Sequence, residues 1–230
     1  VHDQRNQRGT GRARDSRAAL TGRSVIMATK EAAKDATGTN GNVTQAPDLD
    51  QDGIAIQQYQ NMVLVVIPGT GFGEQALRFT RSALENSGIG TRSVSTCYDE
   101  TVRGRLQDEF LVDEKFSDQT MEDYAGIFIG AGETDELATN EHLLRLLREA
   151  EASGKAIATF GNGLEVLARA GVVKGKKVTG SPASVPEAKM AGARYTGRQL
   201  EVSGVVITAL DESAGLRLGR ALARIVQNHS

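Results

Sequence analysis

The chain has 230 residues, of which 24% are charged and 39% are hydrophobic, and its formal net charge is -2 at pH 7. This balance argues against a nucleic-acid-binding protein, which needs a basic surface, and the longest apolar runs are too short to span a bilayer. The single cysteine, Cys97, excludes an intramolecular disulfide and a cysteine-based zinc cluster, and it suits a reducing compartment.

The first 61 residues are polar and lack sustained apolar periodicity, so we expect a flexible leader there and one domain over residues 62–228. Residues 1–26 carry six Arg and two Asp but no apolar core of the kind that a signal peptide requires. Two interpretations stay open for them: sequence upstream of a translation start at Met27, or a genuine disordered tail.

Within the leader, residues 48–54 match the opening positions of an EF-hand calcium loop, in which alternating carboxylates wrap a hard cation. Tyr59 stands where the loop requires a bidentate Glu, and no amphipathic helix precedes the segment. We therefore interpret it as an acidic turn and predict no metal site and no cofactor in this protein.

From Met62 onwards, short continuous apolar runs alternate with amphipathic stretches. This pattern predicts an α/β fold with a single doubly wound, mostly parallel sheet, a flavodoxin-like three-layer sandwich with helices on both faces. The predicted strands cover residues 63–67, 91–96, 126–129, 156–160, 177–179 and 205–209. The predicted helices cover residues 74–86, 141–153 with Asn140 as N-cap, and 214–226.

Three of these strands end in glycine-bearing loops, at residues 69–73, 130–132 and 161–163. The carboxyl ends of parallel strands meet at one edge of a sheet, so a ligand pocket is expected where these loops converge. The first loop also matches a dinucleotide fingerprint through Gly71, Gly73 and Ala76, but a lone glycine pattern is a weak signal, because glycine suits any tight turn.

The third loop follows a buried strand and precedes a helix, in the segment Ala158-Thr159-Phe160-Gly161-Asn162-Gly163-Leu164. A turn of this kind holds one side chain at the edge of the sheet, beside helix N–H groups that stabilise an oxyanion. Gly161 occupies the position of that side chain. The turn therefore indicates a hydrolase-like fold, whereas its residues argue against the usual hydrolase chemistry.

Several segments resemble the DJ-1/PfpI (ThiJ-related) family of the class I glutamine amidotransferase-like superfamily, in matching order and separation over about residues 63–226. They are Ile67-Pro68-Gly69, Tyr124 to Gly132, Gly154 to Ala158, Val166 to Thr179, Ala188 to Tyr195 and Val202 to Thr208. The resemblance also implies a homodimer in the cytoplasm.

The resemblance assigns the family's reactive cysteine to Gly161, the following His to Asn162 and the next Gly to Gly163. The glutamate that lowers the pKa of this cysteine in the family falls on Ala76, and Glu74 lies one helical step earlier. The backbone N–H groups of Ala131 and Asn162 correspond to the oxyanion donors, with Gly130 beside them.

Other nucleophiles have weak support in the sequence. Cys97 follows the second strand on the ligand edge, where a lone cysteine is more often inert. Glu74 could face the pocket, or it could be an acid favoured by the dipole of the helix that it opens. His142 lies in a helix opening and the other two histidines lie near the termini, so no triad is predicted.

Two functions follow. The first is a pseudoenzyme of this family that binds a small ligand or a partner protein at the carboxyl edge, with Gly69, Gly71, Gly73 and Gly163 shaping the loops. The second is a hydrolase, amidase or glyoxalase-like enzyme that uses a non-standard residue such as Glu74 or Cys97. We favour the first because the nucleophile position has no side chain. Neither function involves nucleic acid or a membrane.

Overall fold

The computed structural model describes residues 23–24, 48–49, 55–97 and 101–229. Its centre is a seven-stranded sheet with the strand order β14-β15-β11-β10-β4-β6-β9, in which only the β14–β15 pair is antiparallel. The strands are β4 (Asn61–Ile67), β6 (Ile89–Ser95), β9 (Glu114–Lys115), β10 (Gly126–Ile129), β11 (Ala156–Phe160), β14 (Leu200–Ser203) and β15 (Val206–Ala209). The predicted mostly parallel α/β sheet is confirmed.

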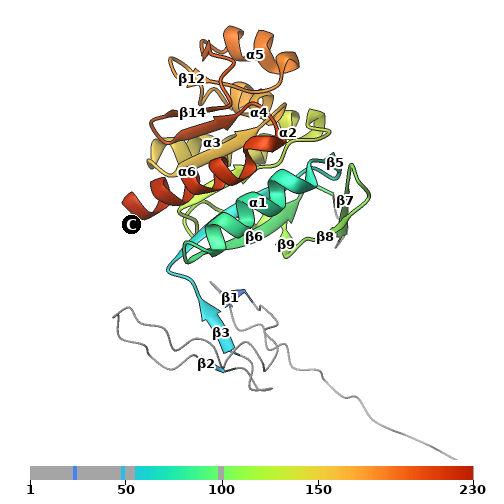
Figure 1. The fold of residues 1–230 in the computed structure, drawn as a ribbon, viewed down its shortest axis with the longest axis vertical. Helices are drawn as coiled ribbons and strands as arrows, with labels where there is room; N and C mark the ends of the chain where they lie inside the picture. The colour runs from blue at the N-terminus through green and yellow to red at the C-terminus, as the bar shows by residue number, and fades with distance from the viewer. Residues whose placement is uncertain (1–22, 25–47, 50–54, 98–100, 230) are drawn as a thin grey trace, which may run out of the picture.

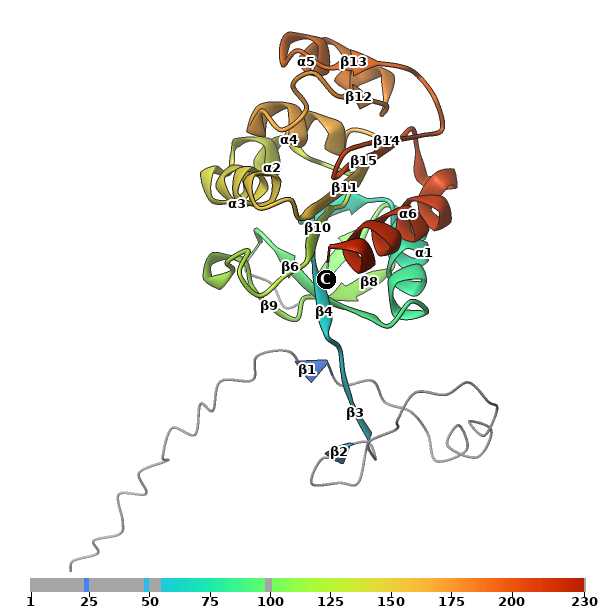
Figure 2. The ribbon, with the colours of Figure 1, turned by 90° about the vertical axis from the view of Figure 1, so that its left-hand side faces the viewer.

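Helices cover both faces of this sheet (Figures 1 and 2). One face carries α1 (Glu74–Glu85) and α6 (Gly215–Asn228). The other face carries α2 (Asp135–Thr139), α3 (Glu141–Ala152) and α4 (Gly163–Ala170), with α5 (Val185–Met190) beyond α4. Short 3-10 turns lie at Phe116–Asp118 (η2), Pro182–Ser184 (η3) and Glu212–Ala214 (η4).

The central strand β4 shows why a continuous apolar run becomes a strand in the middle of such a sheet. Val63 and Val65 pack into the core under α1 and α6, whereas Leu64 and Val66 pack into the core under α3 and α4. All four side chains are fully buried, because successive residues of a strand point to opposite faces and both faces are covered.

Helix α3 follows its sequence signals closely. Asn140 caps the helix, with its Oδ1 accepting the Leu143 N–H at 3.1 Å, and Ser153 ends it. Leu143, Leu144 and Leu147 are buried on one face of the helix, as their spacing predicts. Both the cap and the apolar stripe are confirmed.

Helices α1 and α6 approach each other closely through small residues. A Cβ added at Gly219 would lie 2.7 Å from the Ala83 Cβ, and one added at Gly215 would lie 2.8 Å from the Ala76 Cα. The Thr80 hydroxyl donates to the Gly215 carbonyl at 3.2 Å across a gap of 135 residues in sequence. This contact packs the first helix of the domain against the last one.

The sequence prediction also omits the two outermost strands of the central sheet, β9 and β14, and it differs from the structure in two further places. Residues 177–179 are not part of the central sheet: β12 (Lys177–Val178) pairs only with β13 (Arg194–Tyr195) in a separate two-stranded sheet. The prediction also missed a three-stranded sheet at the carboxyl end of β4, made of β5 (Thr70–Phe72), β7 (Thr101–Gly104) and β8 (Glu109–Leu111).

Within the predicted leader, the structure describes three short strands, β1 (Arg23–Ser24), β2 (Asp48–Leu49) and β3 (Ala55–Gln58), which pair in the order β1-β3-β2. Residues 50–54 of the acidic turn, and Met27, lie outside the described residues. The division into leader and domain stays a prediction.

Candidate functional site

The turn between β11 and α4 is a sharp strand-to-helix elbow. Gly161 has a φ of +57°, in the left-handed region where glycine is favoured. Its N–H donates to the Ala209 carbonyl and its own carbonyl accepts the Ser181 N–H, each at 3.0 Å. Gly163 opens α4, and an added Cβ there would lie 2.0 Å from the Thr159 Oγ1. The predicted strand, turn and helix are therefore all present.

The elbow faces open space. Apart from its two chain neighbours, the one atom of the described residues within 4 Å of a Cβ built on Gly161 is the Ala131 Cβ, at 3.4 Å, which is an ordinary van der Waals contact. A cavity of about 950 Å³ extends from this point. The three predicted glycine loops meet in its wall, which includes Gly71, Gly73, Ala131, Gly132, Gly161 and Asn162. We call this space the elbow cavity.

Asn162 ties the elbow to the second glycine loop. Its Oδ1 accepts the Gly132 N–H at 3.2 Å, and its Nδ2 donates to the Gly132 carbonyl at 2.5 Å. The first loop is joined as well, because the Gly73 N–H donates to the Ala131 carbonyl at 3.0 Å. Gly132 itself has no room for a side chain, since an added Cβ would lie 2.6 Å from the Phe72 Cα. The three glycine loops in the wall of the cavity are therefore held together by hydrogen bonds.

The wall includes backbone donors that have no acceptor among the described residues. Within the described part of the chain, the N–H groups of Ala131 and Asn162 donate to no other group. These are the two groups that the resemblance assigns to an oxyanion site. The neighbouring Gly130 N–H is already used, because it donates to the Val66 carbonyl at 2.9 Å.

The charged side chains in the wall of the cavity are mainly acidic. Glu133 accepts the Thr70 hydroxyl at 2.6 Å, and Asp211 accepts the Ser213 N–H at 2.9 Å. The third acid, Glu212, forms a short ion pair with Arg105. Such a wall repels multiply charged anions unless a cation compensates it.

The dinucleotide interpretation of the first loop gains no support from these contacts. Strand β5 separates β4 from α1, so the loop is not a direct strand-to-helix turn. A Cβ added at Gly73 would lie 2.6 Å from the Glu212 carboxyl carbon, which places a carboxylate where the fingerprint would hold a pyrophosphate. Repulsion between these two anionic groups disfavours that ligand.

Glu74 does not line the elbow cavity. It is 2% exposed, its Oε1 accepts the Leu106 N–H at 2.5 Å, and it is not in the wall of the elbow cavity. Ala76, the position to which the resemblance assigns the activating acid, is buried against Gly215 of α6. Neither position supplies a carboxylate to Gly161.

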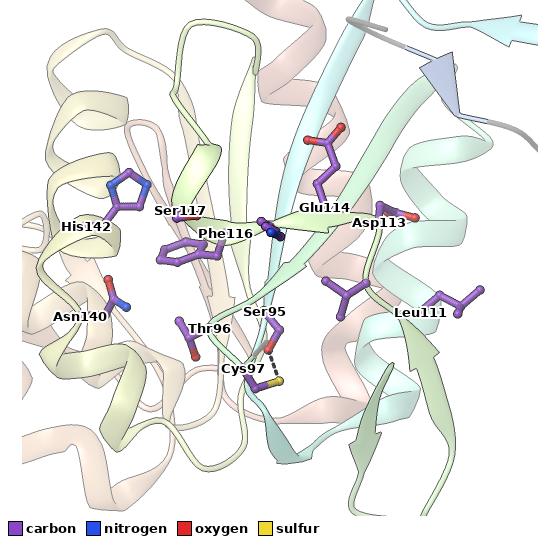
Figure 3. Close-up of a pocket in the computed structure, with 12 residues that line it drawn as sticks. Ser95, Thr96, Cys97, Leu111, Asp113, Glu114, Phe116, Ser117, Asn140 and His142 are labelled. Carbon is purple, nitrogen blue, oxygen red and sulfur yellow. Dashed lines mark hydrogen bonds between the residues drawn. The ribbon is translucent and has the colours of Figure 1, made fainter. Parts of the chain in front are cut away.

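Cys97 is at the carboxyl end of β6, as predicted, but it lines a second cavity of about 780 Å³ rather than the elbow cavity (Figure 3). Its Sγ lies 3.1 Å from the Ser95 Oγ. Gly69 packs beside it, since a Cβ added there would lie 3.3 Å from the Cys97 Cβ. Cys97 therefore lies beside the start of the first glycine loop but outside the wall of the elbow cavity.

His142 lines the same second cavity but is not paired with the thiol. Its Nδ1 contacts the Arg145 guanidinium at 2.7 Å, and its ring packs edge-on against Phe116 with 5.1 Å between the ring centroids. Figure 3 shows His142 and Cys97 on opposite sides of Thr96. Among the described residues, Cys97 forms no hydrogen bond with a histidine.

Among the described residues, no group of three or more His, Cys, Asp or Glu side chains is arranged to hold a metal ion. Over the same residues, no helix combines the length and the apolar character that a bilayer span requires.

The fold and the elbow define a class of protein: flavodoxin-like α/β domains with a strand-to-helix elbow at the carboxyl edge of the sheet. The chain belongs to the DJ-1/PfpI family, whose sequence profile matches residues 61–224. The resemblance found in the sequence is thus confirmed.

The chain is also similar to individual proteins and solved structures. The chain is 33% identical over 172 residues to an uncharacterised protein of Methanocaldococcus jannaschii, and the match covers 73% of this chain and 83% of the relative. A ThiJ/PfpI domain protein from Brachyspira murdochii has a TM-score of 0.71 at 21% identity, over 75% of this chain and 99% of that structure. Drosophila melanogaster DJ-1beta has a TM-score of 0.65 at 21% identity, over 74% of this chain and 95% of that structure. The two structural matches support the fold alone.

The sequence analysis did not predict the part of the elbow-cavity wall that lies outside the glycine loops. Arg105 comes from the β7–β8 turn, and Asp211 and Glu212 follow β15. These segments are short and polar, and no motif or periodicity distinguishes them from ordinary surface loops.

Proposed function

We infer that this protein is a DJ-1/PfpI member without the family's cysteine-dependent catalysis, and that it binds a small ligand in the elbow cavity. The observation that carries the proposal is the combination at Gly161: elbow geometry with a φ of +57°, no side chain, and open space above it. A covalent mechanism needs a nucleophile at this position, whereas a ligand needs only the space and the donors around it.

The surroundings support binding rather than an alternative catalyst. The Ala131 and Asn162 N–H groups lie in the wall and have no partner among the described residues, so a ligand oxygen could accept from them. The two weak catalytic candidates do not reach this space: Glu74 is buried against Leu106, and Cys97 lines the second cavity. A homodimer in the cytoplasm, which the family resemblance implies, stays a prediction.

The first experiment tests catalysis. We would measure methylglyoxal consumption and peptide hydrolysis by the full chain, by Cys97→Ala and by Gly161→Cys. The expected result is no turnover by the full chain or by Cys97→Ala. Turnover by the full chain that disappears in Cys97→Ala would contradict the proposal, since it would place the chemistry at the end of β6.

The second experiment tests binding at the elbow. In the background of Cys97→Ala, the substitution Gly161→Cys introduces a single thiol at the elbow, and its alkylation by iodoacetamide reports access to the cavity. Small polar molecules that raise the melting temperature of the unmodified chain are expected to slow this alkylation. Alkylation of Cys97 in the unmodified chain is the matched control, and ligands of the elbow cavity should leave its rate unchanged.

A further inference from the structure

Glu74 is a buried acid whose role the family chemistry does not explain. It is the first residue of α1 and is 2% exposed. One carboxylate oxygen accepts the Leu106 N–H at 2.5 Å, and the other is buried without a hydrogen-bond partner among the described residues. A half-paired buried carboxylate lowers the stability of a fold, so its presence calls for a role other than stabilising the core.

The carboxylate holds the turn that joins β7 and β8. A Cβ added at Gly104 would lie 2.2 Å from the Glu74 carboxyl carbon, so the side chain fills the space under the turn. On the other side, the Arg105 N–H donates to the Phe72 carbonyl of β5 at 3.0 Å. The backbone of Arg105 and Leu106 is therefore fixed from two directions.

The β7–β8 turn places Arg105 in the wall of the elbow cavity. Its guanidinium forms the ion pair with Glu212, whose carboxylate lies over Gly73 at the start of α1. Among the described residues in the wall, Arg105 is the one with a cationic side chain, whereas Glu133, Asp211 and Glu212 are acidic. Without Arg105, the cavity would present three carboxylates and no compensating charge.

We propose that Glu74 is a positioning residue that holds Arg105 at the elbow cavity, and that Arg105 allows a small carboxylate-bearing ligand to bind there. The inference rests on the proposed function of the cavity. In the ion pair with Glu212 the Arg105 side chain is 64% exposed and the Glu212 side chain is 23% exposed. An ion pair that is exposed on one side contributes little stability, so a ligand carboxylate can replace Glu212 as the partner of Arg105. A second ligand oxygen would then accept from the Ala131 and Asn162 N–H groups.

The test uses two alkylating reagents of nearly equal size, iodoacetate and iodoacetamide. The first carries a carboxylate and the second is neutral. Both would be applied to the thiol introduced by Gly161→Cys in the background of Cys97→Ala, and the readout is the ratio of the two rate constants. A change in the reactivity of the thiol itself affects both rates and cancels in the ratio.

Arg105→Gln is expected to lower the iodoacetate-to-iodoacetamide ratio about threefold to fivefold at low salt, because the reagent carboxylate loses the one cationic side chain among the described residues in the wall of the cavity. Glu74→Ala is also expected to lower the ratio, since the β7–β8 turn is no longer held by Glu74 and no longer keeps Arg105 in the wall of the cavity. Glu74→Gln keeps an acceptor for the Leu106 N–H in the same space and should leave the ratio within about twofold. Arg103→Gln is the matched control, because Arg103 pairs with Glu109 on the same hairpin but does not line the cavity.

The outcomes separate this inference from the proposed function. If Arg105→Gln leaves the ratio unchanged, or if Glu74→Ala changes both rates equally, the role of these residues in charge selection is wrong while the cavity remains a binding site. If the introduced thiol of the folded protein does not react with iodoacetamide at all, the cavity is closed, and the proposed function fails together with the inference.

Discussion

Two glycines of the elbow, only two positions apart, should respond very differently to alanine. At Gly161 an added Cβ meets the Ala131 Cβ at 3.4 Å and nothing closer, so the substitution costs only the strain of a left-handed φ. That strain is roughly 1–2 kcal/mol for an alanine, and the smaller conformational entropy of the unfolded chain offsets part of it. We expect a net loss of about 1 kcal/mol in the free energy of unfolding.

At Gly163 the added Cβ would lie 2.0 Å from the Thr159 Oγ1, which donates to the Ile129 carbonyl at 2.9 Å inside the core. Accommodating it means turning the hydroxyl away from its acceptor and leaving a buried hydroxyl without a partner, which costs about 1–3 kcal/mol, with a similar cost for overpacking. We therefore expect Gly163→Ala to destabilise the protein by about 3 kcal/mol, or roughly 2 kcal/mol more than Gly161→Ala.

The assay is urea unfolding followed by far-ultraviolet circular dichroism, because the chain contains no tryptophan for fluorescence. Thermal scans give a second reading, since a domain of this size loses about 2–4 °C in melting temperature per kcal/mol. Equal losses for the two variants would refute the reasoning, because they would mean that the space above Gly161 is filled.

Three further perturbations have defined outcomes. Asn162→Ala removes both hydrogen bonds to Gly132 and should cost about 1–2 kcal/mol in urea unfolding, whereas an unchanged midpoint would show that the two loops do not depend on this link. Burial raises the pKa of Tyr124 from 10.0 to about 12, so the protonated phenol favours the folded state, and this contribution to stability is complete below pH 10 and lost as the pH rises towards about 12. Unfolding free energies of Tyr124→Phe should lack this alkaline decline, and an identical decline in the variant would contradict the assignment. Gly219→Val should separate α1 from α6 and lower the stability by about 1–3 kcal/mol, and a melting temperature equal to that of the unmodified protein would show that the helices can move apart at no cost.

The central layers of the fold could be predicted because each element carries a strong local signal. The fully apolar run of β4 and the Asn140 cap of α3 fix both the type and the place of their elements. Residues 177–178 do form a strand, but a two-residue pairing with β13 depends on tertiary contacts that no periodicity records. The β5-β7-β8 sheet was missed for the same reason, since its strands are only three or four residues long.

The candidate site was predictable only on the side that the glycine loops form. The convergence of residues 69–73, 130–132 and 161–163 follows from parallel strands that end at one edge, and the cavity lies there. The placement of Cys97 in a separate cavity could not be predicted, because two neighbouring strand ends share an edge without sharing a pocket. Arg105 reaches the elbow only through the hairpin turn over Glu74, a contact between residues far apart in sequence.

The close contact between α1 and α6 also determines when, during synthesis of the chain, the fold can be completed. Thr80 finds its acceptor on Gly215 only after nearly the whole domain has been synthesised, because 135 positions separate them. Until then, the apolar face of α1 and one face of the central sheet have no cover from α6. Closing so long a loop is slow, and an uncovered apolar face is prone to aggregation. A chain that stops before Gly215 should therefore be a substrate for chaperones rather than a smaller version of the same fold.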